Sequence, residues 1–221
     1  MLYKRIITPL KQYFFEWRGL GMGKWMPLLV LYLVIPIMNL MQYHKLGQGE
    51  MFLIQIYLSA FILIPVIAPF FVVIVFQEYY ETMGNELLFL YKRDKVFRAV
   101  GYSVLFHLLT VPLFLVYTII DKRFFMEFVR MSIVIYFICS LAYLLMVLFH
   151  SIAITWVIII CYVIYNILFH NGQLWCVVYF YALWMDRELL MRVYLPMLGL
   201  SVFLFTIARF ISLRFDKLRY L

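Results

Sequence analysis

Charged residues are scarce in this sequence. Only 14% of its 221 residues are Asp, Glu, Lys or Arg, whereas 67% are hydrophobic and 20% are aromatic. A soluble domain carries roughly 25% charged residues, and the mean hydropathy of this chain is +0.98. These values exclude an ordinary water-soluble core, so we expect an integral membrane protein with no room for a separate soluble domain.

Residues with catalytic or metal-binding patterns are equally scarce. The three cysteines (Cys139, Cys161 and Cys176) lack metal-ligand spacing and are interpreted as small core residues of the apolar segments. No serine lies in a G-x-S-x-G turn, and the histidines form no H-E-x-x-H pattern. Gly21-Met22-Gly23-Lys24 is no P-loop, because Trp25 follows the lysine where Ser or Thr would hold magnesium. We therefore expect no enzyme, and no catalytic residue, metal or cofactor in this chain.

Long apolar runs fill the rest of the sequence, and they are continuous rather than alternating, which predicts helices. A helix needs about 20 residues to cross a bilayer. We predict an all-α fold in which residues 25–221 form one domain of six transmembrane helices. The expected spans are residues 25–41, 51–76, 99–120, two spans within 131–170 that are separated at His150-Ser151, and 194–211.

Shorter segments connect and precede these spans. Residues 1–24 have apolar side chains at positions 3, 6, 7, 10, 14 and 17 between basic residues, which is typical of a cytoplasmic amphipathic helix on a membrane surface rather than a signal peptide. Residues 121–130 are expected to form a short charged loop. Residues 174–185 are too few to cross a bilayer and predict an interfacial or re-entrant segment between the last two spans.

The distribution of Lys and Arg predicts the orientation. With six spans, one side carries five of these residues in the N-terminal segment, four in residues 77–98 and four at the C-terminal end, against six on the other side. Because cytoplasmic loops carry the excess of Lys and Arg, both termini and residues 77–98 are expected in the cytoplasm, in a multi-pass protein of the cell membrane. The net charge of +8 is thus a topology signal, and no nucleic acid is expected as a partner.

The most polar internal stretch is residues 77–98. Glu78, Glu81 and Glu86 come first, and Lys92 and Arg93 follow. Acidic residues early and basic residues late suit the dipole of a helix. A solvated loop between two spans explains the same composition, so both interpretations stay open.

Within this stretch, Gly84-Asn85-Glu86-Leu87-Leu88, followed by Lys92-Arg93 and a new apolar span, resembles the loop between the second and third spans of ABC-2 type permeases. The resemblance implies a coupling helix that contacts a separate ATP-binding subunit, which would hold ATP and Mg. It also implies an exporter built as a homodimer or with a second permease subunit, and here an amphipathic cargo. The alternative is a non-transporting membrane protein, such as an immunity or scaffold protein or a small intramembrane enzyme.

Polar residues inside the expected spans are further candidates. Ser151, Thr155, Tyr162 and Asn166 share one face of a helix, as do Gln55 and Ser59. Such faces line a pathway, meet a dimer partner or simply allow close packing against membrane helices. His107 is either a functional ionisable group within the membrane or a neutral, hydrogen-bonded residue of the helix bundle.

Overall fold

The computed structural model describes residues 21–80, 95–168 and 184–218. Regular structure in these ranges is entirely helical, without a strand, which confirms the predicted all-α class. Five described helical stretches are long and apolar enough to cross a membrane: Met22–Leu46, Glu50–Gln77, Lys95–Ile120, Arg123–Phe149 and Arg187–Arg214. A sixth apolar helix, Ile152–Leu168, has only 17 residues, so the count of six spans stays a prediction.

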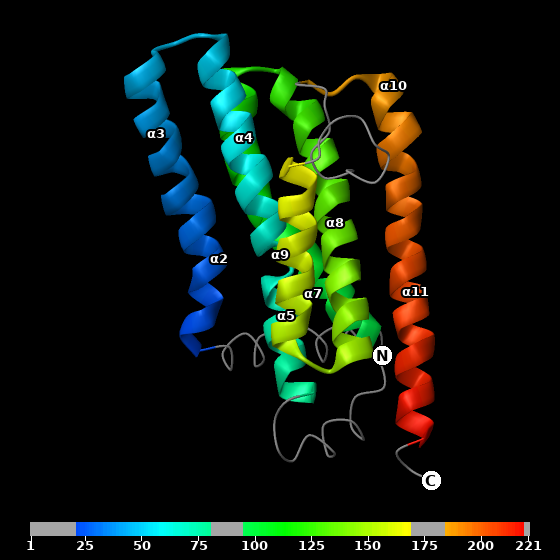
Figure 1. Ribbon diagram of the computed structural model, residues 1–221. Helices are drawn as coiled ribbons and strands as arrows, with labels where there is room; N and C mark the ends of the chain where they lie inside the picture. The colour runs from blue at the N-terminus through cyan, green and yellow to red at the C-terminus, as the bar shows by residue number, and fades with distance from the viewer. Residues whose placement is uncertain (1–20, 81–94, 169–183, 219–221) are drawn as a thin grey trace, which may run out of the picture.

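The helices run up and down beside one another along a common axis (Figure 1). Their order is η1 (Gly21–Lys24), α2 (Trp25–Leu29), η2 (Val30–Val34), α3 (Ile35–Leu46), α4 (Glu50–Ile67), α5 (Phe70–Tyr80), α7 (Lys95–Ile120), α8 (Arg123–Phe149), α9 (Ile152–Leu168), α10 (Arg187–Leu189), η3 (Leu190–Tyr194) and α11 (Leu195–Leu218). The α3–α4 and α7–α8 turns and α10 lie at the end drawn uppermost. The start of α2, the end of α5, the α8–α9 turn and the end of α11 lie at the lower end (Figure 1).

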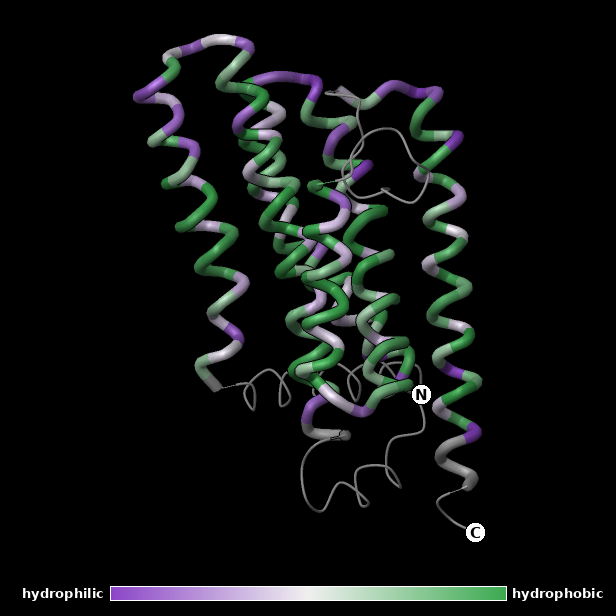
Figure 2. Tube along the Cα trace, viewed as in Figure 1, coloured by the Kyte–Doolittle hydropathy of each residue, from purple (hydrophilic) through white to green (hydrophobic). Residues whose placement is uncertain are grey.

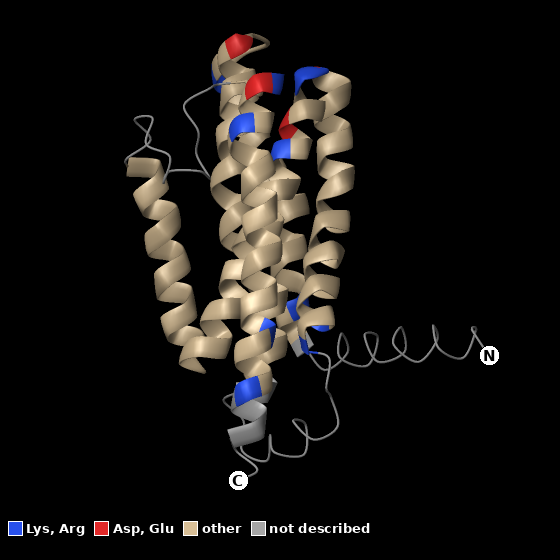
Figure 3. Ribbon diagram, turned by 90° about the vertical axis from the view of Figure 1, so that its right-hand side faces the viewer, with Lys and Arg blue, Asp and Glu red and all other residues tan. Residues whose placement is uncertain are grey.

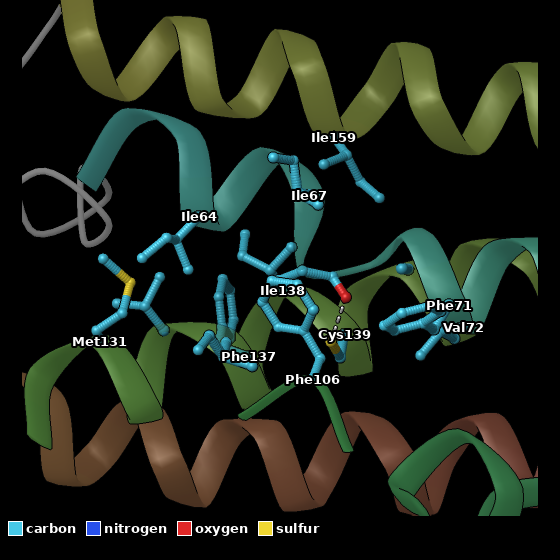
Figure 4. Packing of buried hydrophobic residues seen from close by; sticks show 14 of the residues in the cluster. Ile64, Ile67, Phe71, Val72, Phe106, Met131, Phe137, Ile138, Cys139 and Ile159 are labelled. Carbon is cyan, nitrogen blue, oxygen red and sulfur yellow. Dashed lines mark hydrogen bonds between the residues drawn. The ribbon is translucent and has the colours of Figure 1, made fainter. Parts of the chain in front are cut away.

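Prolines interrupt two of the long helical stretches. The second span breaks between α4 and α5, with Pro65 inside α4 and Pro69 in the turn. A proline has no N–H and leaves a carbonyl of the preceding turn without its helical donor. The buried thiol of Cys139 donates to the carbonyl of Ala68 beside this break, at 3.3 Å between S and O (Figure 4). Cys139 is therefore a core residue as predicted, whereas the same prediction is wrong for Cys161, which is exposed.

Two π-helical turns also precede prolines. η2 ends just before Ile35-Pro36, and η3 ends just before Leu195-Pro196. Because each proline cannot donate to the turn below it, the local hydrogen bonding shifts and the turn widens. The first long helix (Met22–Leu46) and the last one (Arg187–Arg214) therefore each contain one π-helical turn shortly before a proline.

The predicted charged loop at 121–130 is wrong. Only Asp121 and Lys122 separate α7 from α8, and residues 123–130 form the first two turns of α8. A helix fits here because it buries Phe124 and lets Glu127 and Arg130 pair across one turn. The predicted break at His150-Ser151 is confirmed as a helix break, because α8 ends at Phe149 and His150 adopts a left-handed conformation with φ of 51°.

The last long helix begins earlier than predicted. Residues 187–193, which precede the span predicted at 194–211, are helical and continue into α11. The Asp186 carboxylate accepts the backbone N–H of Arg187 at 2.6 Å, and Glu188 pairs with Arg192 one turn later. This cap and ion pair start the helix before its apolar residues begin. Of the predicted interfacial segment 174–185, all but Trp184 and Met185 lie outside the described residues.

Hydropathy and charge are distributed unevenly along the bundle axis. The helices are predominantly hydrophobic between their ends (Figure 2). Among the residues that Figure 3 colours by charge, the acidic ones all lie toward the upper end, where basic residues accompany them: Glu50, Asp121, Glu127, Asp186 and Glu188. The residues coloured toward the lower end are all basic: Lys24, Lys95, Arg98, Arg209 and Arg214.

Candidate functional site

The upper half of the bundle contains a fully buried ion pair. Arg130 Nη2 lies 2.5 Å from Glu127 Oε2, and both side chains are 0% exposed. The guanidinium group also donates to the hydroxyl of Tyr57. Aromatic rings surround it, with its central carbon 4.5 Å from the ring centre of Phe61, 4.9 Å from that of Tyr57 and 5.8 Å from that of Tyr194. This pair therefore joins α8 to α4 and to η3.

Trp184 and Met185, which lie shortly before α10, also contact the start of α8 around this ion pair. The backbone N–H of Met185 donates to Glu127 Oε1 at 2.6 Å. The ring of Trp184 packs edge-on against Phe124 at 5.7 Å, and the Arg123 guanidinium lies 4.0 Å above it. Glu127 Oε1 is hydrogen-bonded, whereas Oε2 has the ion pair with Arg130 but no hydrogen bond from the described residues. This buried charge is therefore compensated mainly by its ion pair. We interpret this cluster as an internal anchor rather than an acid or base for catalysis.

A second polar group connects three different helices. Asn39 Nδ2 donates to the Tyr117 hydroxyl at 2.6 Å, and the Ser59 hydroxyl donates to Asn39 Oδ1 at 2.8 Å. All three side chains are buried, and they join α3, α7 and α4. Their hydrogen bonds hold the first long helix against the bundle near its upper end.

Beside this group, α3, α4 and α7 enclose a groove of about 1120 Å³. Its lining is mostly apolar, with polar residues toward the α3–α4 turn. The lining residues are Tyr32, Pro36, Asn39, Leu40, Tyr43, Gln48, Gly49, Glu50, Phe52, Leu53, Ile56, Pro112, Leu113, Val116, Tyr117 and Ile120. A mostly apolar cavity with a few placed polar groups is the usual form of a small-molecule site.

His107 forms a third polar group within the bundle. Its Nδ1 lies 2.9 Å from the Tyr136 hydroxyl, and its Nε2 lies 2.9 Å from Ser132 Oγ. The Ser132 hydroxyl also lies 2.7 Å from the carbonyl of Phe128, so this carbonyl and Nε2 compete for its single hydrogen. An imidazole with a hydroxyl beside each ring nitrogen is consistent with the second of the two interpretations of His107, a hydrogen-bonded residue of the helix bundle.

Most residues of the polar helix faces predicted within the spans are buried or half-buried in the helix bundle. On α9, Thr155 and Asn166 are buried and donate to the carbonyls of Ser151 and Tyr162, four residues earlier. Ser151, just before α9, and Tyr162 are half-buried. On α4, Ser59 belongs to the group around Asn39, and Gln55 is half-buried one turn away. The burial of these groups suits close helix packing. A pathway or dimer role for them stays a prediction.

The predicted coupling residues lie beyond what the structure describes. Glu81, Glu86, Lys92 and Arg93 fall outside the described residues, and Glu78 lies near the end of α5 without a described side chain. The structure does describe where this stretch leaves and re-enters the bundle. α5 ends at Tyr80 and α7 begins at Lys95, both at the lower end (Figure 1).

Sequence reasoning missed Glu127, Arg130 and Asn39. The first two were counted as loop charges, and Asn39 was passed over within an apolar span. An acid and a base three residues apart, between Phe124 and Met131, is a signal of a helix that buries a pair. A lone Asn in a membrane helix is likewise a signal of an interhelical hydrogen bond. The chain matches no protein family, no curated protein and no solved structure, so its function has to be inferred from these residues and their geometry.

Proposed function

We propose that the chain is the membrane-spanning permease subunit of an ABC-2 type exporter. It would move an amphipathic cargo out of the cytoplasm together with a separate ATP-binding subunit, which hydrolyses ATP with Mg. The proposal starts from the resemblance of residues 84–93 to the coupling loop of that family. A homodimer or a second permease subunit would complete the transporter.

The observation that best supports this proposal is the charge at the end of the bundle where α5 ends and α7 begins. The described helices that flank this stretch end at the same side as the start of α2 and the end of α11 (Figure 1). The described charged side chains of that side are all Lys or Arg (Figure 3). A cationic end belongs in the cytoplasm by the positive-inside rule, which is where an ATP-binding subunit would meet the coupling residues.

A second candidate function is an intramembrane hydrolase, and the contact between Ser132 and His107 is the observation that favours it. Nucleophilic serines are activated by a base that accepts their proton. Here the Phe128 carbonyl, 2.7 Å from Ser132 Oγ, competes with the imidazole for the hydroxyl hydrogen. We therefore prefer the transport function.

The transport proposal is tested by reversing charges in the coupling stretch. We expect Glu81→Lys and Glu86→Lys to leave the protein inserted but to release the ATP-binding subunit or uncouple its ATP hydrolysis from transport. Loss of a buried charge pair costs about 2–5 kcal/mol, which is at least about 30-fold in affinity. The measurements are the ATPase that co-purifies in mild detergent and the transport rate.

The matched control is Glu188→Lys, a reversal at the opposite end of the bundle, where the Glu188 side chain is 66% exposed. It is expected to retain the ATPase and transport. If Glu81→Lys and Glu86→Lys both behave as wild type, or if the wild-type chain purifies without any ATP-binding subunit, the proposal is wrong.

A further inference from the structure

The groove between α3, α4 and α7 is bounded by two polar bridges to α7. At its upper part, Asn39 donates to the Tyr117 hydroxyl at 2.6 Å. At its lower part, the Tyr32 hydroxyl donates to the carbonyl of Leu109 at 2.5 Å. These bridges start from positions seven residues apart on the first long helix, about 10 Å along its axis. They hold that helix to α7 while the space between them stays open.

The groove has an apolar body and a polar mouth. Its apolar walls include Pro36 and Leu40 on one side and Leu113 and Val116 on the other. The hydrogen-bonding groups of Asn39, Ser59 and Tyr117 are directed to one another. A polar ligand group placed this deep would lose its water without gaining these partners, which is unfavourable. The occupant of the body must therefore be apolar.

Polar groups gather instead where the groove meets the α3–α4 turn. Tyr43, Gln48 and Glu50 line this mouth, and Gln48 donates to the Tyr43 hydroxyl at 3.4 Å. Glu50 is 64% exposed and pairs with Arg123 of α8. The mouth can therefore hydrogen-bond a polar headgroup, and the charge of its Glu50 is already paired with that of Arg123.

The length of the groove indicates the size of its occupant. From Tyr43 at the mouth to Tyr32 at the lower bridge is eleven residues of helix, about 16 Å at 1.5 Å per residue. The hydrocarbon core of a bilayer is about 30 Å thick, so the groove has the depth of one leaflet. Its walls are also open to the surroundings, because Leu40 is 59% and Val116 is 55% exposed.

We propose that this groove binds one phospholipid from the adjacent leaflet of the bilayer. An acyl chain lies along Pro36, Leu113 and Val116, and the headgroup lies at Tyr43, Gln48 and Glu50. The lipid fills the space that the two bridges leave between the first long helix and α7. Unlike lipids that cover the outer surface, this one contacts three helices, α3, α4 and α7, and has a defined position. The site does not depend on the proposed transport function.

The test uses the purified chain in nanodiscs that contain phosphatidylcholine with a diazirine at the end of one acyl chain. Illumination and peptide mapping locate the attached lipid. We expect labelling to concentrate on the groove peptides around residues 35–40 and 112–117, relative to the exposed residues Val202 and Phe203 of α11. Val116→Trp, which fills the groove, should lower the groove labelling at least fivefold and leave that of α11 unchanged.

The control is Leu115→Trp, the neighbouring residue of α7, which is 59% exposed and does not line the groove. It should label as wild type. Leu40→Trp fills the groove from the opposite wall and replaces Val116→Trp if that variant loses its helical circular dichroism. Equal labelling of the groove and α11 peptides, or equal effects of Val116→Trp and Leu115→Trp, would overturn the proposal. Because no ATPase is present, neither result depends on whether the chain is a transporter.

Discussion

The upper end of α8 carries two arginine–carboxylate pairs, two helical turns apart, in different surroundings. Arg123 pairs with Asp121 and Glu50, each at 2.8 Å, and its side chain is 40% exposed. Arg130 pairs with Glu127 at 2.5 Å, and both side chains are completely buried. Both pairs contact the chain that enters α10, through Trp184 and Met185 respectively.

The surroundings, and not the chemistry of the pair, decide what each one contributes. An exposed ion pair exchanges water for a partner and typically contributes about 0–1 kcal/mol. A buried pair gives up far more hydration, so removing one partner leaves an uncompensated charge that costs about 3–5 kcal/mol. We infer that the Arg130 pair fixes how α4, α8 and η3 pack, whereas the Arg123 pair only adds to the attachment of Trp184.

The largest expected effect comes from breaking the buried pair. Arg130→Met and Glu127→Leu should each lower the free energy of unfolding by about 3–5 kcal/mol, because each leaves its partner charged and buried. The double variant should recover most of this loss, since an apolar pair of similar volume needs no hydration. The measurement is an SDS titration from a mild detergent, followed by tryptophan fluorescence.

The recovery of stability in the double variant is the decisive part of the experiment. If the two single losses simply add in the double variant, the side chains act through packing and not as a charge pair. If each single variant stays within about 1 kcal/mol of wild type, the pair is hydrated in solution, and its contrast with the Arg123 pair disappears.

A smaller effect is expected at the exposed pair. Arg123→Ala removes two ion pairs and the contact of the guanidinium with the Trp184 ring, and a cation–π contact at an exposed site contributes about 0.5–1 kcal/mol. We expect a loss of about 1 kcal/mol in the same titration. The control is Lys122→Ala, its exposed neighbour, which should stay within about 0.5 kcal/mol of wild type. A loss at Arg123 as large as that at Arg130 would show that exposure does not separate the two pairs.

The features that could be predicted from the sequence depend on neighbours along the chain. Long apolar runs define helices, Pro65 and Pro69 define a break, and the polar residues His150-Ser151 define a turn. The start of α8 could not be predicted in this way. Glu127 and Arg130 resemble loop charges until Tyr57, 73 residues away from Arg130, is brought beside them. The groove depends likewise on how far the first long helix stands from α7, which only the bridges from Tyr32 and Asn39 determine.

The smallest effect is the dependence of the exposed pair on pH. Hydrogen bonds from the Arg123 side chain and backbone N–H lower the pKa of the Asp121 carboxyl below its ordinary value. A group whose pKa is lowered by folding stabilises the fold above its ordinary pKa of about 3.9, and this contribution is lost as the pH falls through the lowered pKa. Because the pair is exposed, the contribution should be about 0.5 kcal/mol.

The experiment compares Asp121→Asn with its parent, both carrying Glu50→Gln so that the other carboxylate of Arg123 does not titrate. An asparagine can still accept the backbone N–H of Arg123 through its side-chain oxygen, so the difference in unfolding free energy reports the charge. In a nonionic detergent with urea as denaturant, we expect this difference to be constant from pH 7 to 5 and to shrink below about pH 4. A difference that already shrinks between pH 7 and 5 would contradict the lowered pKa. A difference that persists to the lowest pH would mean that the Asp121 charge does not stabilise the start of α8, and that only the buried pair contributes as an ion pair.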